Sequence, residues 1–127
     1  MRVLAHATSP AMLGAINDLI HDRWFEIDGT VFDESARTVR IPFDPIARSA
    51  ASGAVLTPET IQILEVRRAR VLNVHDSERV SRYDFDRIEW DGNANAVLVR
   101  TGVPVSIRVE VDEVDVMVLE PSALTPP

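Results

Sequence analysis

The first clear hydrophobic pattern along the chain predicts an amphipathic helix. Its apolar residues recur at spacings of three and four, at Met12, Leu13, Ile16, Leu19 and Ile20. Ser9 is a suitable N-cap, and Pro10 suits the first helical position, where a missing N–H has no cost. We expect the helix to end near His21 or Asp22, because the following RWFEIDG has the composition of a strand.

From that point the apolar positions follow a period of two, which predicts strands. The segments WFEID, TVF and RTVRIPF fit this pattern, with turns at Asp28-Gly29 and DESAR. Pro42 and Pro45 are expected to end the run, since proline cannot donate to a ladder. Residues 47–55, ARSAASGAV, are small and weakly patterned, and we expect a mobile loop there.

Residues 57–76 allow two interpretations. Thr57 and Pro58 resemble a second helix start, whereas β-branched residues without a clean helical stripe favour strands. We expect strands that extend to about His75.

The remainder of the chain predicts strands more clearly. RYDFDRIEW and NAVLVRT flank Asp91-Gly92, the pair that a two-residue type I′ hairpin turn requires. VPVSIRVEV alternates along its whole length, and the acidic run EVDEVD at 110–115 is expected at exposed positions. VDVMVLE becomes apolar on both faces, which is typical of a central strand or of a subunit contact. The expected interface residues are Val114, Val116, Met117, Val118 and Leu119.

These patterns predict a mainly β protein, an antiparallel barrel or sandwich of about seven to nine short strands after one N-terminal helix. An α+β fold is the alternative. The helix should plug one opening or cover one sheet face. We expect a single domain over residues 1–120, which suits a chain of 127 residues, and a frayed tail at 121–127.

The composition limits the cellular compartment and the classes of binding partner that we expect. The chain has no cysteine, and its N-terminal residues lack the apolar core of a signal peptide, which favours the cytoplasm. No apolar run is long enough to predict a membrane span. The net charge of −7 disfavours nucleic acid. The most basic stretch, residues 65–87, also carries five acidic residues, so we expect ion pairs there.

Two histidine–aspartate doublets are the candidate chemistry. His21-Asp22 and His75-Asp76 could supply nitrogen and carboxylate ligands to zinc, manganese or iron if the fold brings them together. The preferred interpretation is local. His21 should complete the last helical turn, with Asp18 near its ring, and Asp76 should bond turn backbone beside Ser77. Neither a phosphate-binding glycine loop nor a G-x-S-x-G motif is present.

Two resemblances involve the first doublet. His21-Asp22 resembles the pair that names the HD phosphohydrolases, with His6 as an upstream histidine, but a largely β chain cannot present that family's helical metal site. LIHDRWFEID, together with RIEWDG and VSIRVEV, resembles small bacterial proteins of uncharacterised function that open with a helix and an HD-x-x-F segment. Those are similar in outline to toxin-immunity-type and other binding proteins. The resemblance implies no activity and no catalytic residue.

We therefore expect a non-enzymatic cytoplasmic binding or assembly module without a cofactor. Self-association is expected through VDVMVL or an exposed strand edge, and the acidic charge suits a basic protein partner. A metal-dependent hydrolase using the two doublets is the alternative. A small-ligand-binding barrel, gated by residues 47–55, is a further one.

Overall fold

A computed structural model of the chain describes residues 1–47 and 61–121. In that part the protein has one α-helix, α1 (Leu13–Ile20), and two short 3₁₀ helices, η1 (Pro10–Met12) and η2 (Ile27–Gly29). The strands are β1 (Arg2–Ala7), β2 (Arg23–Glu26), β3 (Val31–Asp33), β4 (Thr38–Ala47), β5 (Gln62–Arg67), β6 (Ala69–His75), β7 (Arg82–Asp91), β8 (Ala96–Thr101), β9 (Ser106–Val111) and β10 (Val116–Glu120).

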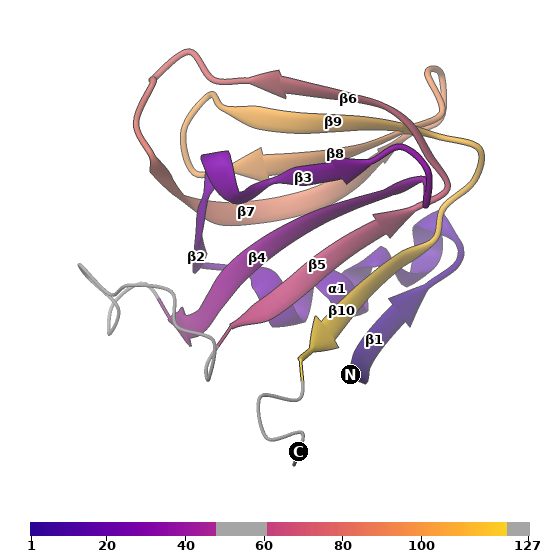
Figure 1. Cartoon of the computed structure of the whole chain (residues 1–127), viewed down its shortest axis with the longest axis horizontal. Helices are drawn as coiled ribbons and strands as arrows, with labels where there is room; N and C mark the ends of the chain where they lie inside the picture. Colours follow the sequence, from indigo (N-terminus) through magenta and orange to yellow (C-terminus); the bar gives the residue numbers. More distant parts are fainter. Residues whose placement is uncertain (48–60, 122–127) are drawn as a thin grey trace.

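The ten strands form one antiparallel sheet, which confirms the mainly β prediction (Figure 1). Their order is β1-β10-β5-β4-β2-β7-β8-β9-β6, with β3 paired to β4 beside this path. The sheet curves strongly but does not close into a barrel. Nine strands follow the helix, as expected, while β1, which precedes it, was not predicted from the sequence.

The sheet has two halves, β1-β10-β5-β4-β2 and β7-β8-β9-β6, which pair with each other through β2 and β7. The chain also passes from one half to the other at a corner between two consecutive strands, β5 and β6. Arg68 alone separates β5 from β6, and it bends the chain with a left-handed φ of 57°. β5 pairs with β10 and β6 pairs with β9, so both strand pairs turn together from one half into the other. The stretch from 57 to 76 is thus two strands wherever it is described, as predicted; residues 57–60 lie outside the described residues.

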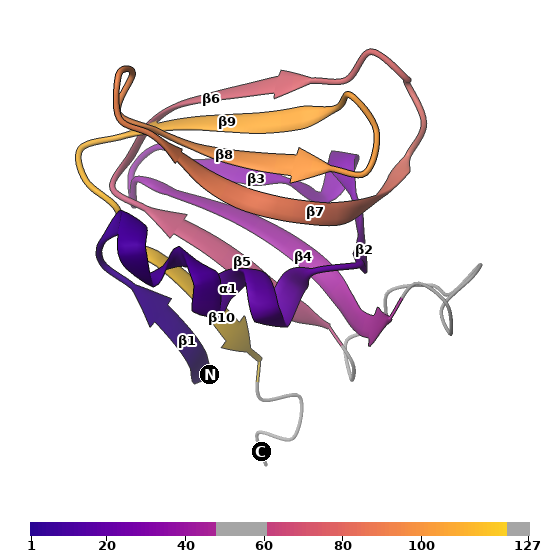
Figure 2. The same cartoon turned by 180° about the vertical axis from the view of Figure 1, so that it is seen from behind.

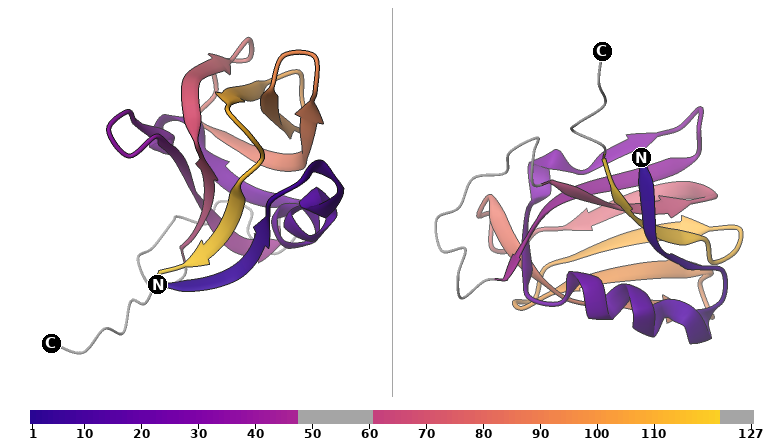
Figure 3. Two further views of the ribbon diagram at one scale, coloured as in Figure 1. Left: turned by 90° about the vertical axis from the view of Figure 1, so that its right-hand side faces the viewer. Right: turned by 90° about the horizontal axis from the view of Figure 1, so that it is seen from below.

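The helix covers the open side of the curved sheet. Leu13, Ile16 and Ile20 form its buried face, which packs against β7 and against β1 and β10 (Figures 2 and 3). Its start differs from the expectation in detail. Ser9 has the extended backbone of an N-cap, but its side chain makes no capping hydrogen bond, and the turn that begins at Pro10 is 3₁₀.

The prediction that Pro42 and Pro45 end a strand is wrong, because β4 continues through both prolines to Ala47. On one side, β4 pairs with β3 at residues 38–40 and with β2 from Phe43 onward, so Pro42 lies between the two ladders. Pro45 lies where the register with β2 shifts. Both prolines therefore occupy interruptions of that ladder, where a missing N–H is tolerated.

The expected two-residue turn at Asp91-Gly92 is also wrong. Asp91 pairs with Ala96 across a four-residue loop, in which Ala94 N–H donates to Asp91 O at 3.3 Å. The left-handed residue is Asn95, with a φ of 47°. A four-residue loop built around an ordinary turn connects β7 to β8, so the type I′ geometry of a two-residue turn is not required. Similarly, β9 begins at Ser106, because the residues before it turn the chain from β8.

Three phenylalanines form the centre of the core. Phe25 of β2 stacks on Phe85 of β7 with ring centroids 4.3 Å apart, and Phe43 of β4 meets Phe85 edge-on at 5.5 Å. All three are fully buried. They hold together the strands at which the two halves of the sheet meet.

No helix among the described residues is long and apolar enough to span a membrane. The predicted loop at 47–55 lies outside the described residues except for Ala47, which ends β4. The predicted tail also lies outside them, apart from Pro121.

Candidate functional site

The first doublet lies at the end of α1, where it completes the edge of a strand. β2 pairs with β7 only at residues 82–84, so the rest of that edge of β7 faces the helix. Asp22 N–H donates to Phe85 O at 2.9 Å, and His21 Nδ1 lies 2.9 Å from Asp86 O. Since a carbonyl can only accept, Nδ1 is the protonated nitrogen. The doublet therefore provides hydrogen bonds to an open strand edge.

Asn17, one turn earlier on α1, continues the same edge. Its Nδ2 donates to Ile88 O at 3.2 Å, and its Oδ1 accepts from Ile88 N–H at 2.6 Å. The amide thus replaces a neighbouring strand for both backbone groups of one residue. A polar position off the apolar stripe of the helix was the available sequence signal, but nothing local revealed its partner.

The charge around His21 favours its protonated form. The hydrogen bond to Asp86 O, followed by the nearby carboxylate of Asp22, raises the pKa of His21. His21 Nε2 lies 3.7 Å from Asp22 Oδ2, so the adjacent carboxylate is the neighbour, rather than the expected Asp18. The His21 ring lies at the end of the helix, as predicted. It donates to a carbonyl of β7, however, rather than to a carbonyl of the helix.

The second doublet lies at the end of β6. Asp76 accepts hydrogen bonds from Arg79 N–H at 2.9 Å and from the Tyr83 hydroxyl, which is the local turn role expected of it. Burial, and then this hydrogen bond, raise the pKa of Tyr83. His75 is exposed and lines a cleft of about 410 Å³ together with Asp86 and Arg100.

His21, Asp22, His75 and Asp76 are not gathered around one point. Within residues 1–47 and 61–121, no three side chains of the metal-binding types lie close enough together to hold an ion. Asp22 uses its backbone N–H in a hydrogen bond to β7, and Asp76 uses its side chain in a hydrogen bond to the local turn. The two doublets therefore form hydrogen bonds that support the fold, and their four side chains do not form a set of metal ligands.

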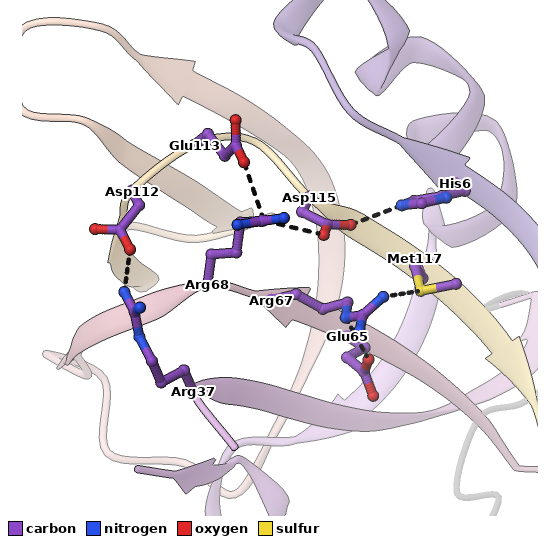
Figure 4. Close-up of polar contacts among 9 residues, drawn as sticks. All are labelled: His6, Arg37, Glu65, Arg67, Arg68, Asp112, Glu113, Asp115 and Met117. Carbon is purple, nitrogen blue, oxygen red and sulfur yellow. Dashed lines mark hydrogen bonds and ion pairs between the residues drawn. The ribbon is translucent and has the colours of Figure 1, made fainter. Parts of the chain in front are cut away.

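A second polar cluster lies at the corner where β5 meets β6 and β9 leads to β10 (Figure 4). Arg68 Nε lies 3.1 Å from Glu113 Oε1 and 3.5 Å from Asp115 Oδ2. Asp115 Oδ1 is 2.6 Å from His6 Nε2 of β1, and Arg37 pairs with Asp112. These contacts join the bend at Arg68 to the connection between β9 and β10 and, through Asp115, to β1.

The same cluster holds a buried carboxylate on β5. Glu65 is 5% exposed, and its oxygens lie 2.7 Å from Arg40 Nε and 3.7 Å from Arg67 Nε. Asp115 is also buried, so the expectation that the whole run at 110–115 lies on exposed positions is wrong for this residue. A small cleft of about 170 Å³ opens here among three arginines, but carboxylates already match them. We interpret the cluster as structural.

The predicted interface residues have different environments. Val116 and Val118 are fully buried in the core, and Val114 and Leu119 are nearly so. Met117 is half-buried on the opposite face, next to Arg67. β10 lies between β1 and β5, which explains its apolar character on both faces as that of a central strand.

The free edge of the sheet at β6 is the most evident surface for a partner. In the described part of the chain β6 pairs with β9 alone. It exposes Val71 and Val74, at 41% and 45%. At the opposite end of the strand order, β1 carries a register irregularity between Val3 and Ala5, a feature that makes an edge harder to pair.

Comparison with known proteins adds no assignment. No family model matches the chain, and no curated protein or solved structure was found to be similar to it.

Proposed function

We propose that the protein is a non-enzymatic cytoplasmic binding or assembly module that forms a homodimer by pairing two copies of β6. The observation that carries this proposal is an open strand edge with exposed valines. Such an edge presents unpaired backbone groups to another chain, and antiparallel pairing of identical edges gives a closed two-fold dimer. No described group of side chains favours the metal-dependent hydrolase.

The backbone of β6 has a definite polarity. Val111 N–H donates to Asn95 O on the β8 side of β9, while Asp112 N–H donates to Arg68 O on the other side. Because these directions alternate along a strand, Ser106, Arg108 and Glu110 direct their backbone groups to β6.

Their register partners on β6 are His75, Asn73 and Val71. It follows from the same alternation that Leu72 and Val74 direct their N–H and C=O groups to the free edge. A second copy of β6 can form an antiparallel ladder with this edge only if the residues whose N–H and C=O groups point outward, such as Leu72 and Val74, lie opposite one another.

We propose the register that places the exposed apolar residues of the two copies opposite one another. With Asn73 on the two-fold axis, Leu72 of each copy lies opposite Val74 of the other, and Val71 lies opposite His75. This places apolar side chains together twice and opposes no like charges. Asn73 then faces its own copy in a non-hydrogen-bonded pair, where side chains come closest.

This geometry can be tested by cross-linking, since the natural chain has no cysteine. Asn73→Cys should form a disulfide-linked dimer under mild oxidation, because the Cα atoms of a non-hydrogen-bonded pair are about 4.5 Å apart, within disulfide range. Val71→Cys is the matched control. Two copies of residue 71 would be offset by four residues, about 13 Å along the strands, and should not cross-link.

A second variant tests the edge without cysteine chemistry. Val74→Pro removes an N–H that points to the free edge and leaves the β9 ladder intact, so light scattering should show a shift from dimer to monomer. The proposal is wrong if the wild type is a monomer at micromolar concentration. Equal cross-linking of Asn73→Cys and Val71→Cys would also overturn it.

A further inference from the structure

A cleft of about 410 Å³ opens on the β7-β8-β9-β6 half of the sheet, beside the connection from β8 to β9. A row of four side chains crosses the sheet at this cleft. His75 of β6 is the register partner of Ser106 of β9. Ser106 is also the partner of Arg100 of β8, which is itself the partner of Arg87 of β7. Register partners project to the same face of an antiparallel sheet, and all four residues, here called the donor row, line the cleft.

The donor row faces away from the core. Ser106 lies between Val105 and Ile107, which are both buried, so its side chain points to the opposite face of the sheet. The side chains of Arg87 and Arg100 are at least half exposed, and His75 is exposed as well. A dissolved ligand can therefore reach the row.

Each member of the donor row supplies a hydrogen-bond donor. A guanidinium presents a planar fork of N–H groups, an imidazole has at least one N–H, and a serine hydroxyl can rotate to donate. Among the described residues, neither the His75 ring nor the Ser106 hydroxyl has a hydrogen-bond or ion-pair partner. Both groups are therefore available to a ligand.

The two arginines of the row share a single carboxylate. Glu89 Oε1 lies 2.6 Å from Arg87 Nε, and Glu89 Oε2 lies 2.5 Å from Arg100 Nε. A carboxylate has fewer acceptor sites than two guanidinium groups have N–H donors, so a positive charge and several N–H groups remain for a ligand. Glu89 also restrains both arginines, and this reduces the side-chain entropy that binding would cost.

One carboxylate lines the described part of the cleft. Asp86 lies at the register shift between Phe85 and Arg87, and its charge helps to raise the pKa of His21. It forms no ion pair with another described side chain. This carboxylate opposes an anion in the cleft, so its removal should increase the affinity for an anion.

The wall of the cleft beside the donor row is apolar and is held by hydrogen bonds. Val103 and Pro104 contribute exposed apolar surface from the β8-β9 connection. Thr101 Oγ1 lies 2.8 Å from Val105 O, and Ser77 Oγ donates to Pro104 O at 3.1 Å. Because these bonds fix the connection, the cleft is largely preformed, and a ligand would lose little free energy in ordering it.

We infer that this cleft binds a small organic molecule through its phosphate group. A phosphate accepts several hydrogen bonds at once, and the fork of an arginine matches two of its oxygens. The hydroxyl and the imidazole of the donor row supply further donors from neighbouring strands, and the apolar wall suits the organic part of the molecule. The volume of the cleft lies within the range of small-molecule sites. This inference does not depend on the pairing of β6, because the whole donor row belongs to one copy.

The experiment uses phenyl phosphate as the probe and compares it with inorganic phosphate and with uncharged benzyl alcohol. Titrations followed by ¹H–¹⁵N NMR at low ionic strength should show saturable shifts of the Ser106 and Arg100 amides with phenyl phosphate. Benzyl alcohol should bind at least about tenfold more weakly, because it lacks the charge-assisted hydrogen bonds. Inorganic phosphate should also bind more weakly, since it has no apolar group to contact Val103 and Pro104. The net charge of −7 repels anions from the rest of the surface, which limits unspecific binding.

Four variants locate the site. Arg100→Gln should weaken binding of phenyl phosphate by about tenfold, and Ser106→Ala, which removes a single hydroxyl, should weaken it by a smaller factor. Asp86→Asn should strengthen binding. Arg2→Gln removes the same charge as Arg100→Gln from β1, at the other end of the strand order, and should leave binding unchanged. Melting curves confirm that each variant is folded.

Several results would overturn the inference. They are the absence of saturable shifts at Ser106 and Arg100, equal weakening by Arg2→Gln and Arg100→Gln, or weaker binding to the Asp86→Asn variant. Equal affinity for inorganic phosphate and phenyl phosphate would indicate free phosphate as the ligand and would overturn the assignment to an organic molecule.

Discussion

At the scale of single residues, one side chain of each histidine–aspartate doublet forms a hydrogen bond that supports the backbone. His21 bonds the carbonyl of Asp86, and Asp76 bonds the amide of Arg79. Asp22 reaches its position with a left-handed φ of 61°, a conformation that aspartate tolerates better than most residues. A histidine beside an aspartate is thus no evidence of a metal site until the strands around it are known.

His21 should contribute stability that depends on pH. Its pKa is raised in the folded protein, so the contribution is fully present below its ordinary value of about 6.5 and is lost as the pH rises through the folded value. His21→Gln keeps a donor for the Asp86 carbonyl but cannot become charged. The wild type should therefore be more stable than this variant at about pH 5.5, with a smaller difference at about pH 8.5.

Unfolding in urea at the two pH values measures this difference, and an NMR titration of the ring gives the pKa directly. A difference in stability that is the same at both pH values, or a ring pKa below 6.5, would contradict the prediction.

At the scale of elements, α1 acts partly as a substitute strand. Beyond the last residue paired with β2, the edge of β7 is hydrogen-bonded by the helix end and by Asn17. Sequence periodicity predicted the apolar face of this helix correctly, because that face is a local property. It could not predict the role of its polar side, since Ile88 is 71 positions away along the chain.

Asn17→Ala should leave both backbone groups of Ile88 without their partner. An unsatisfied buried group costs about 1–3 kcal/mol, so we expect a loss of this order in the free energy of unfolding. Asn17→Asp keeps the acceptor for the Ile88 N–H and loses the donor, so its loss should be smaller. Equilibrium urea unfolding of the three proteins ranks them; equal stability of Asn17→Ala and the wild type would contradict the proposed role.

At the scale of the whole molecule, the curved sheet depends on a corner and a core. Polar side chains of β1, β4 and β5 and of the connections beside them meet at the corner around Arg68, and the three phenylalanines fill the interior between the sheet halves. Because these contacts join strands far apart in sequence, we expect the described domain to unfold cooperatively.

Phe85→Ala should be among the most destabilising substitutions, because Phe85 contacts both Phe25 and Phe43. A loss of about 3–5 kcal/mol in the free energy of unfolding is expected from the lost burial and the cavity. Phe85→Leu should lose less, since it fills part of the space. Guanidinium unfolding measures both, and a loss below about 1 kcal/mol for Phe85→Ala would show that the ring is not central to the core.

The sequence by itself determined the local pattern of this protein. Alternation assigned Ile107, Val109 and Val111 to one buried face, and a three-and-four spacing assigned the buried face of α1, because both periods follow directly from backbone geometry. The tertiary structure alone decided which strands are neighbours, why β4 can contain two prolines, and what each doublet bonds. These depend on pairings between distant segments, and no local pattern of side chains encodes where such partners will lie.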